Sequence, residues 1–153
     1  MRFLLRDDIE TIHAATDLLA EAKLSPELRN EALYYRAKAY TKQKAGKKAM
    51  EDYRELAKDT RNPYGAEAKY QVAQSLYDAK EYAAAEKELL NYIEQSTPHA
   101  YWLARSFVLL SDVYHATGKD LDARQYLLSL QQNYQGNDDI ESMIESRLSK
   151  LKV

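Results

Sequence analysis

Histidine is the side chain best suited to acid–base or metal chemistry near neutral pH, and the chain contains three. His115 follows Asp112 by three positions, so on a helix the two side chains share a face and could together ligate a metal ion. The same pair is also what the polar surface of an ordinary helix offers. None of the histidines occurs in the H-E-x-x-H pattern of zinc proteases, so the spacing predicts no metal site.

Other catalytic patterns are missing from the sequence. There is no G-x-S-x-G or P-loop pattern, and the four glycines are too scattered to cradle a phosphate. With no cysteine, the chain offers no thiolate and no disulfide. The carboxylate pairs Asp7-Asp8 and Asp138-Asp139 stand where helices are expected to begin, and helix capping explains them. We therefore expect no enzyme: no catalytic residue, no cofactor and no metal.

Residues 97–106, TPHAYWLARS, contain the only tryptophan together with a histidine, a tyrosine and an arginine. Such a mixture is typical of an active-site loop, but a structural interpretation also fits. In that interpretation Thr97 caps a helix that Pro98 begins, and Tyr101 and Trp102 pack against the preceding helix pair. Only Arg105 is then left as a candidate contact to a ligand.

Composition excludes two classes of partner. Acidic and basic residues nearly cancel, giving a net charge of −2, whereas a protein that binds phosphate backbones usually has a basic excess. No apolar run approaches the length of a membrane span. We therefore expect neither nucleic-acid binding nor membrane insertion. Glycine and proline are scarce, with four and three residues, which favours a helical chain.

The prolines divide the chain at nearly equal intervals. Each follows a residue that caps helices well, in Ser25-Pro26, Asn62-Pro63 and Thr97-Pro98. A small polar side chain accepts a hydrogen bond from the first free amides, and proline suits the first helical position because its missing N–H has no partner there. Three helices are therefore expected to begin at these prolines, with a period that suggests an internal repeat.

The segments after the prolines share a packing pattern. A small residue is followed three positions later by a large one, then by an alanine nine positions on and a large residue four beyond that. A short turn separates the two halves. Small residues let two helices approach closely and large ones fill the space beside the crossing. The members are Ala37, Tyr40, Ala49 and Tyr53; Ala73, Leu76, Ala85 and Leu89; and Ser111, Tyr114, Ala123 and Leu127.

This pattern resembles the tetratricopeptide repeat (TPR) family. The resemblance implies an all-α fold, an α-α superhelical solenoid of helix hairpins with a capping helix at the C-terminal end. It covers nearly the whole chain as one domain. The pattern departs from the family at Lys69, where a large apolar residue is expected, and in its long period. The expected parts are a half repeat at 1–24, repeats at 26–60, 63–96 and 98–135, and a capping helix at 137–153.

The two ends of the chain differ. An amphipathic helix is expected from Ile9 to Leu24, with Ile9, Ile12, Ala15, Leu18 and Leu19 on its apolar stripe. Met1–Leu5 then corresponds to the tail of a missing first helix. We expect the chain to continue into further repeats before Met1, as the C-terminal part of a large bacterial multi-TPR protein. A short protein with a frayed start is the alternative. At the other end, an apolar stripe is formed by Ile140, Met143, Ile144, Leu148 and Leu151.

In the TPR family the first helix of each hairpin lines a concave groove that binds peptides. The matching register gives Glu31, Tyr34, Lys38, Thr41 and Lys42; Glu67, Tyr70, Gln74, Tyr77 and Asp78; and Arg105, Val108, Asp112 and His115. Of these, the candidate contacts to a partner are Tyr34, Lys38, Tyr70, Gln74, Tyr77, Arg105, Asp112 and His115. The carboxylate clamp of TPR co-chaperones is not matched, because only Arg105 has the required charge at the required position.

Two functions remain open. The first is a non-enzymatic scaffold for protein–protein interaction, whose concave face binds a peptide or partner protein. The second is a purely structural extension and cap of a longer TPR array, with no ligand of its own. Localisation is equally open: the cell envelope or periplasm for a piece of an exported bacterial TPR protein, otherwise the cytoplasm. The identity of any partner does not follow from these residues.

Overall fold

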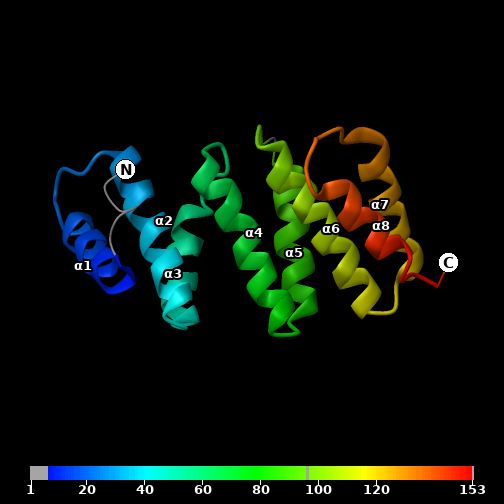
Figure 1. The fold of residues 1–153 in the computed structure, drawn as a ribbon, viewed down its shortest axis with the longest axis horizontal. Coiled ribbons are helices and arrows are strands. Elements are labelled where there is room, and N and C mark those ends of the chain that lie inside the picture. The colour runs from blue at the N-terminus through cyan, green and yellow to red at the C-terminus, as the bar shows by residue number, and fades with distance from the viewer. Residues whose placement is uncertain (1–6, 96, 153) are drawn as a thin grey trace. The chain divides into compact units, whose positions relative to one another are not determined.

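The computed structural model describes residues 7–95 and 97–152. Over these residues the chain forms α-helices and no strand, so the predicted all-α class is confirmed (Figure 1). The expectation for Met1–Leu5 lies outside the described residues. None of the described helices is both long and apolar enough to cross a membrane. The helices are α1 (Asp8–Leu19), α2 (Pro26–Lys42), α3 (Gly46–Leu56), α4 (Pro63–Asp78), α5 (Tyr82–Glu94), α6 (Ala100–Ala116), α7 (Asp120–Asn133) and α8 (Ile140–Leu148).

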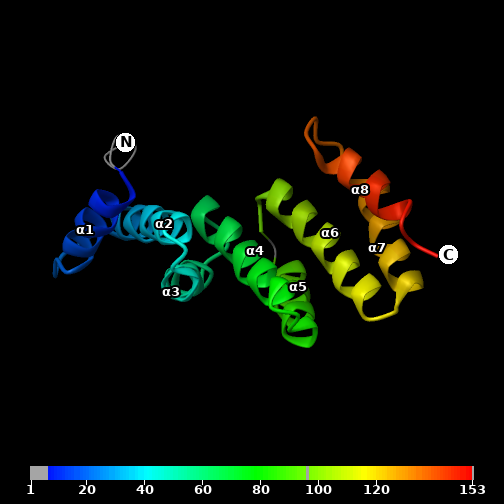
Figure 2. The same cartoon turned by 60° about the horizontal axis from the view of Figure 1, so that its bottom comes forward.

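The chain divides into two compact units, one up to Lys69 and one from Tyr70 onward, so that α4 contributes to both. We call them the N-terminal and the C-terminal unit. In the N-terminal unit α2 contacts both α1 and α3. In the C-terminal unit α6 contacts α5, α7 and α8, and α7 also contacts α8 (Figures 1 and 2). Each unit is thus built from helices that pack on their neighbours in the sequence.

The predicted helix starts are confirmed at two of the three prolines. The Ser25 hydroxyl accepts a hydrogen bond from the Leu28 amide at 3.2 Å, and Pro26 is the first residue of α2. The Asn62 side chain accepts one from the Gly65 amide at 2.8 Å, and Pro63 begins α4. The prediction for Pro98 is wrong, because α6 begins only at Ala100.

All three helical hairpins turn in the same way. The first helix ends with a left-handed residue, Lys44 (φ 59°), Lys80 (φ 62°) or Gly118 (φ 78°). The amide of the residue that follows then donates to the carbonyl five residues earlier. These bonds are Ala45 N to Tyr40 O (2.8 Å), Glu81 N to Leu76 O (2.9 Å) and Lys119 N to Tyr114 O (2.7 Å). This is the Schellman motif, and its recurrence confirms the register in which the three turns were aligned.

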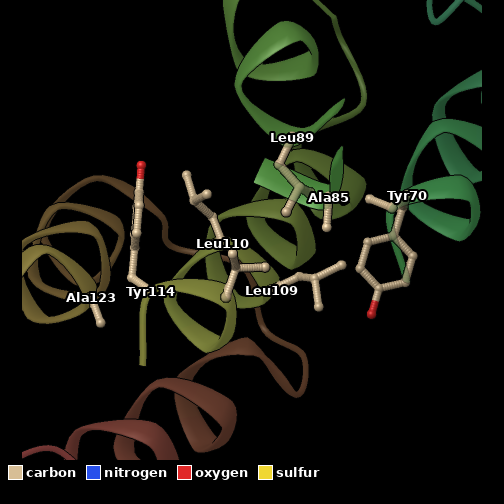
Figure 3. Packing of buried hydrophobic residues seen from close by; sticks show 9 residues of the cluster. Tyr70, Ala85, Leu89, Leu109, Leu110, Tyr114 and Ala123 are labelled. Carbon is tan, nitrogen blue, oxygen red and sulfur yellow. The ribbon is translucent and has the colours of Figure 1, made fainter. Parts of the chain in front are cut away.

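The core of the C-terminal unit fills the space between α4, α5, α6 and α7. Figure 3 shows Leu109 and Leu110 of α6 between Tyr114 on one side and Ala85, Leu89 and Tyr70 on the other. The repeated alanines, Ala85 and Ala123, are completely buried, as the packing pattern predicts. Trp102 packs against this same cluster, on the side of the preceding helices as expected.

Helix α8 covers the C-terminal end of this unit. Ile140 and Ile144 are buried against Val108 and Leu127, and Met143, Leu148 and Leu151 pack at the margin of the same cluster. The predicted apolar stripe is therefore confirmed from Ile140 to Leu148. The predicted helix bounds of 137–153 are wrong, because α8 ends at Leu148 and Leu151 packs on the cluster from beyond the helix. Tyr101 also packs here, so the expectation that it lies against the preceding helix pair is wrong.

The N-terminal unit departs from expectation in α1. This helix ends at Leu19, not Leu24, and it buries Thr11, Ala15 and Leu18. Ile9, predicted on the apolar stripe, is 59% exposed. Ala15 and Leu18 pack on Ala32 of α2, and together they mark the face of α1 that is buried against α2. Ile9 lies outside that buried face.

Candidate functional site

The N-terminal unit holds a group of three tyrosines in which the ring of Tyr34 contacts the other two; we call Tyr34, Tyr35 and Tyr64 the tyrosine cluster. Tyr34 meets Tyr35 edge to face, with ring centroids 5.2 Å apart at 81°. It meets Tyr64 at 4.6 Å and 40°. All three are half-buried, so part of each ring is open to solvent. Aromatic pairs of this geometry stabilise each other beyond the area that they bury.

The tyrosine cluster is tied by polar contacts to α4. The Tyr34 hydroxyl donates to Glu67 Oε1 at 2.9 Å, and Lys38 Nζ lies 3.2 Å from Glu67 Oε2. The Lys38 ammonium also lies 4.9 Å from the centre of the Tyr34 ring. Burial, and next the negative charge of Glu67, raise the pKa of Tyr34 well above its usual value. The sequence-predicted residues Tyr34 and Lys38 are thus brought together, around a carboxylate.

The C-terminal unit holds a second group, which we call the arginine cluster: Tyr70, Tyr101, Trp102 and Arg105. Arg105 donates from Nη1 to the Tyr101 hydroxyl at 2.9 Å and from Nη2 to the Tyr70 hydroxyl at 3.0 Å. Its guanidinium carbon lies 4.9 Å from the Tyr70 ring centre and 5.9 Å from that of Trp102. The cation is therefore held by both hydroxyls and ring faces.

The charge of Arg105 is balanced through a neighbour. In the part of the chain that the structure describes, Arg105 pairs with no carboxylate directly, and its Nε has no hydrogen-bond partner. Tyr101, which accepts from Arg105, donates in turn to Asp139 at 3.0 Å. Burial opposes the charge, but the hydrogen bonds from Arg105 to Tyr101 and Tyr70 outweigh it and raise the pKa of Arg105.

The remaining predicted residues make contacts of their own. Gln74 accepts from the Tyr70 hydroxyl at 2.8 Å and donates to Asp78 at 2.9 Å. Tyr77 packs against Tyr82 with ring centroids 5.6 Å apart. Asp112 pairs with Arg147 of α8 at 3.2 Å, and burial raises the pKa of Asp112 despite that partner. His115 lies 2.9 Å from Asp120, so Asp112 and His115 each have a different partner.

Three register positions of the expected groove, Glu67, Tyr70 and Val108, are buried rather than open to a ligand. Val108 is 1% exposed and packs in the cluster beneath α8, so its assignment to a ligand-facing position is wrong. Tyr70 is 5% exposed, and both its hydroxyl and its ring face are in contact with Arg105, so little of its ring is open to a partner.

The structure adds partners that the register did not include: Tyr35, Tyr64, Tyr101, Trp102, Asp139 and Arg147. Tyr101 and Arg105 are four residues apart, a spacing that places them on one helix face, so the contact between them could be predicted from the sequence. Asp139 and Arg147 lie more than thirty residues from Tyr101 and Asp112, and no local spacing connects them.

No group of three or more histidine, aspartate or glutamate side chains arranged to hold a metal ion occurs in residues 7–95 and 97–152. The chain matches no protein-family model, no curated protein and no solved structure.

Proposed function

We propose that the chain is a TPR-like helical solenoid that acts as a non-enzymatic scaffold and binds a peptide or partner protein through its first helices. Those helices are α2, α4 and α6, the ones that carry the tyrosine and arginine clusters. The three identical hairpin turns support the repeat architecture. The contacts of α6 with both α7 and α8 support it too, because a first helix in a solenoid packs on its own partner and on the next hairpin.

The observation that carries the interaction function is a set of half-exposed aromatic rings whose positions are already fixed. Tyr34 is held by Glu67, and Tyr101 is held by Arg105 and Asp139. Rigid aromatic side chains bind at low entropic cost, since little freedom remains for a partner to remove. Neighbouring carboxylate and cationic groups supply polar contacts that give such a surface its specificity.

Selection of binders from a random peptide display library, with the 153-residue chain as bait, tests this function. We expect enriched peptides whose affinity falls at least about tenfold in Tyr64→Leu or in Tyr101→Leu, as for aromatic residues at the centre of an interface. Tyr126→Leu, on the second helix α7, is the matched control and should change affinity less than about twofold. Circular dichroism of each variant confirms that the fold is kept.

The structural alternative has an observation in its favour. Many polar groups of the two clusters are bonded within the chain, and α8 covers the end of the C-terminal unit. If the chain only extends and caps a longer array, the display selection yields no enriched peptide. Peptides that are enriched but insensitive to both tyrosine changes would place recognition outside the first helices.

A further inference from the structure

The turn between α2 and α3, at one tip of this hairpin (Figure 1), carries a concentrated positive charge. Residues 42–48, KQKAGKK, include four lysines and no acidic residue. All four lysines are exposed, and within residues 7–95 and 97–152 none of them forms an ion pair. We call Lys42, Lys44, Lys47 and Lys48 the lysine patch.

The hairpin turn does not require this charge. The three turns share a left-handed residue and the hydrogen bond that follows it, so their equivalent residues can be compared. In the second turn, residues 78–84 contain one lysine, one aspartate and one glutamate. In the third, residues 116–122 contain one lysine and two aspartates. The same geometry is therefore formed twice more in the chain by sequences in which acidic residues outnumber the lysine.

Lysine is also an unfavourable choice at most of these positions. Lys47 and Lys48 lie in the first turn of α3, where the helix dipole opposes a positive charge and no acidic residue is present. Lys44 adopts the left-handed backbone that suits glycine. Neighbouring ammonium groups in addition repel one another. Unfavourable placements concentrated in a single turn indicate a role other than stability.

The surroundings of the lysine patch favour a narrow anionic partner over a flat one. Asp8 accepts a hydrogen bond from the Gln43 side chain at 3.2 Å, and Glu51 follows Lys47 by four positions on α3. Carboxylates therefore border the patch. A uniformly negative membrane surface would approach these carboxylates together with the lysines and be repelled by them. An extended acidic chain can follow the lysines alone.

Single-stranded nucleic acid fits the lysine patch less well than an acidic peptide does. Proteins that bind single strands stack the bases on aromatic rings. The ring beside the patch, Tyr40, is already contacted by two cations, Arg36 at 5.8 Å and Lys48 at 5.7 Å from its centre. The chain, with a net charge of −2, also lacks the overall basic excess of such proteins.

We propose that the lysine patch binds an acidic segment of a partner protein, a run of aspartate or glutamate side chains in an extended chain. The ammonium groups pair with successive carboxylates, and their long flexible stems adapt to the spacing of the run. Charges elsewhere on the chain oppose this little, because salt screens exposed charges beyond about 8 Å. The inference goes beyond the function proposed above, since the patch lies at the hairpin turn and outside the tyrosine and arginine clusters.

Fluorescence anisotropy with a fluorescein-labelled octaglutamate peptide tests the lysine patch. We expect saturable binding that weakens at least about tenfold when salt rises from about 50 to about 500 mM, because the paired charges are exposed. A labelled peptide of alternating serine and glycine should not bind. The double variant Lys44→Gln/Lys47→Gln should weaken the binding of octaglutamate about fivefold.

The double variant Lys80→Gln/Lys87→Gln is the matched control. It removes the same charge from exposed positions and places glutamine at the equivalent left-handed residue of the second turn. Its affinity for octaglutamate should change less than about twofold. Circular dichroism of both double variants checks that the helices are kept.

Unchanged affinity in Lys44→Gln/Lys47→Gln, or equal losses in the two double variants, would overturn the inference. Tighter binding of phosphatidylserine vesicles or of labelled oligothymidylate than of octaglutamate would overturn it too, because the partner would then be a lipid surface or a nucleic acid. The display selection with Tyr64→Leu and Tyr101→Leu leaves these lysines intact. Failure of the proposed function and failure of this inference are therefore separate results.

Discussion

Asp52 is a carboxylate on α3 that is buried to 4% exposure, an uncommon position for a charged side chain. It is satisfied by Arg36 of α2, which donates from Nε to Oδ2 at 2.8 Å and from Nη2 to Oδ1 at 2.6 Å. Arg36 also donates to the Thr16 hydroxyl on α1 at 3.2 Å. One guanidinium thus joins the first three helices of the N-terminal unit.

Replacing Asp52 with asparagine should destabilise the protein by about 2 to 3 kcal/mol, because the largely buried Arg36 would lose its counter-charge. Urea denaturation followed by circular dichroism measures the change. Asp59→Asn is the matched control, since Asp59 pairs with the exposed Arg61. That variant should lose less than about 1 kcal/mol. Equal losses in the two variants would contradict a special role for the buried pair.

Single side chains show where sequence reasoning succeeds and where it stops. The buried alanines Ala49, Ala85 and Ala123 could be predicted, because a helix crossing demands a small residue at a fixed spacing. The partners of Tyr34 and Asp112 could not, since Glu67 and Arg147 come from helices 33 and 35 residues away. Contacts of that kind depend on how helices pack, which local periodicity does not specify.

Among the elements, the hairpin turns carry a conformational cost that differs between repeats. A left-handed backbone is free of strain for glycine but unfavourable for residues with a Cβ. Gly118 therefore suits its turn, whereas Lys44 and Lys80 do not suit theirs. The repeated hydrogen bonds hold these lysines in place despite the cost.

We expect Lys44→Gly and Lys80→Gly each to stabilise the protein by about 1 kcal/mol, and Gly118→Ala to destabilise it by a similar amount. Thermal denaturation of the three variants measures the differences. Gly46→Ala is the control: Gly46 begins α3 without a left-handed backbone, and a methyl group there would meet no atom within 4 Å. A loss of stability in both lysine variants would show that the side chains matter more than the backbone.

Gly65 is under a different constraint, because the backbone of the preceding turn approaches it closely. A Cβ at this position would lie 1.8 Å from the Asp59 carbonyl oxygen, in the turn that leads into α4. Gly65→Ala should therefore destabilise the protein by about 2 kcal/mol or more, because backbone atoms would have to move. The free energy of unfolding in urea tests this. An unchanged free energy of unfolding in Gly65→Ala would mean that the turn before α4 can shift to admit a Cβ at little energetic cost.

The start of α6 was mispredicted for a local reason. The Thr97 hydroxyl accepts from the amide of His99, two residues on, rather than from an amide of a following helical turn. The Ala100 amide bonds to the Pro98 carbonyl at 3.2 Å. These short-range bonds compete with helix formation and postpone it by two residues. A cap residue followed by proline therefore predicts that a helix begins nearby, but it does not fix the residue at which the helix begins.

For the molecule as a whole, the 13 tyrosines couple stability to alkaline pH. Burial and Glu86 raise the pKa of Tyr114 strongly, burial and Asp138 raise that of Tyr134 to about 12, and Tyr34 is shifted upward as well. A phenol in the unfolded chain ionises near pH 10. Between that pH and the higher folded pKa values, the unfolded state loses protons first, so it is favoured.

The free energy of unfolding should therefore be constant up to about pH 10 and then fall, by about 1 kcal/mol per pH unit for a buried tyrosine such as Tyr114. Denaturant titrations at a series of pH values measure the fall. Absorbance at 295 nm should show exposed tyrosines ionising before the shifted ones. If all tyrosines ionise together near pH 10 while the helical signal persists, the raised pKa values are wrong.

The way α8 is attached has a mechanical consequence. Asp139, just before this helix, bonds to Tyr101, and Arg147, near its end, pairs with Asp112, while Ile140 and Ile144 are buried between them. A helix fastened at one end only can be peeled away turn by turn under tension. Since α8 is fastened at both ends to α6, a pulling force has to break its attachments nearly together. It is therefore expected to detach in one abrupt step rather than by gradual unravelling.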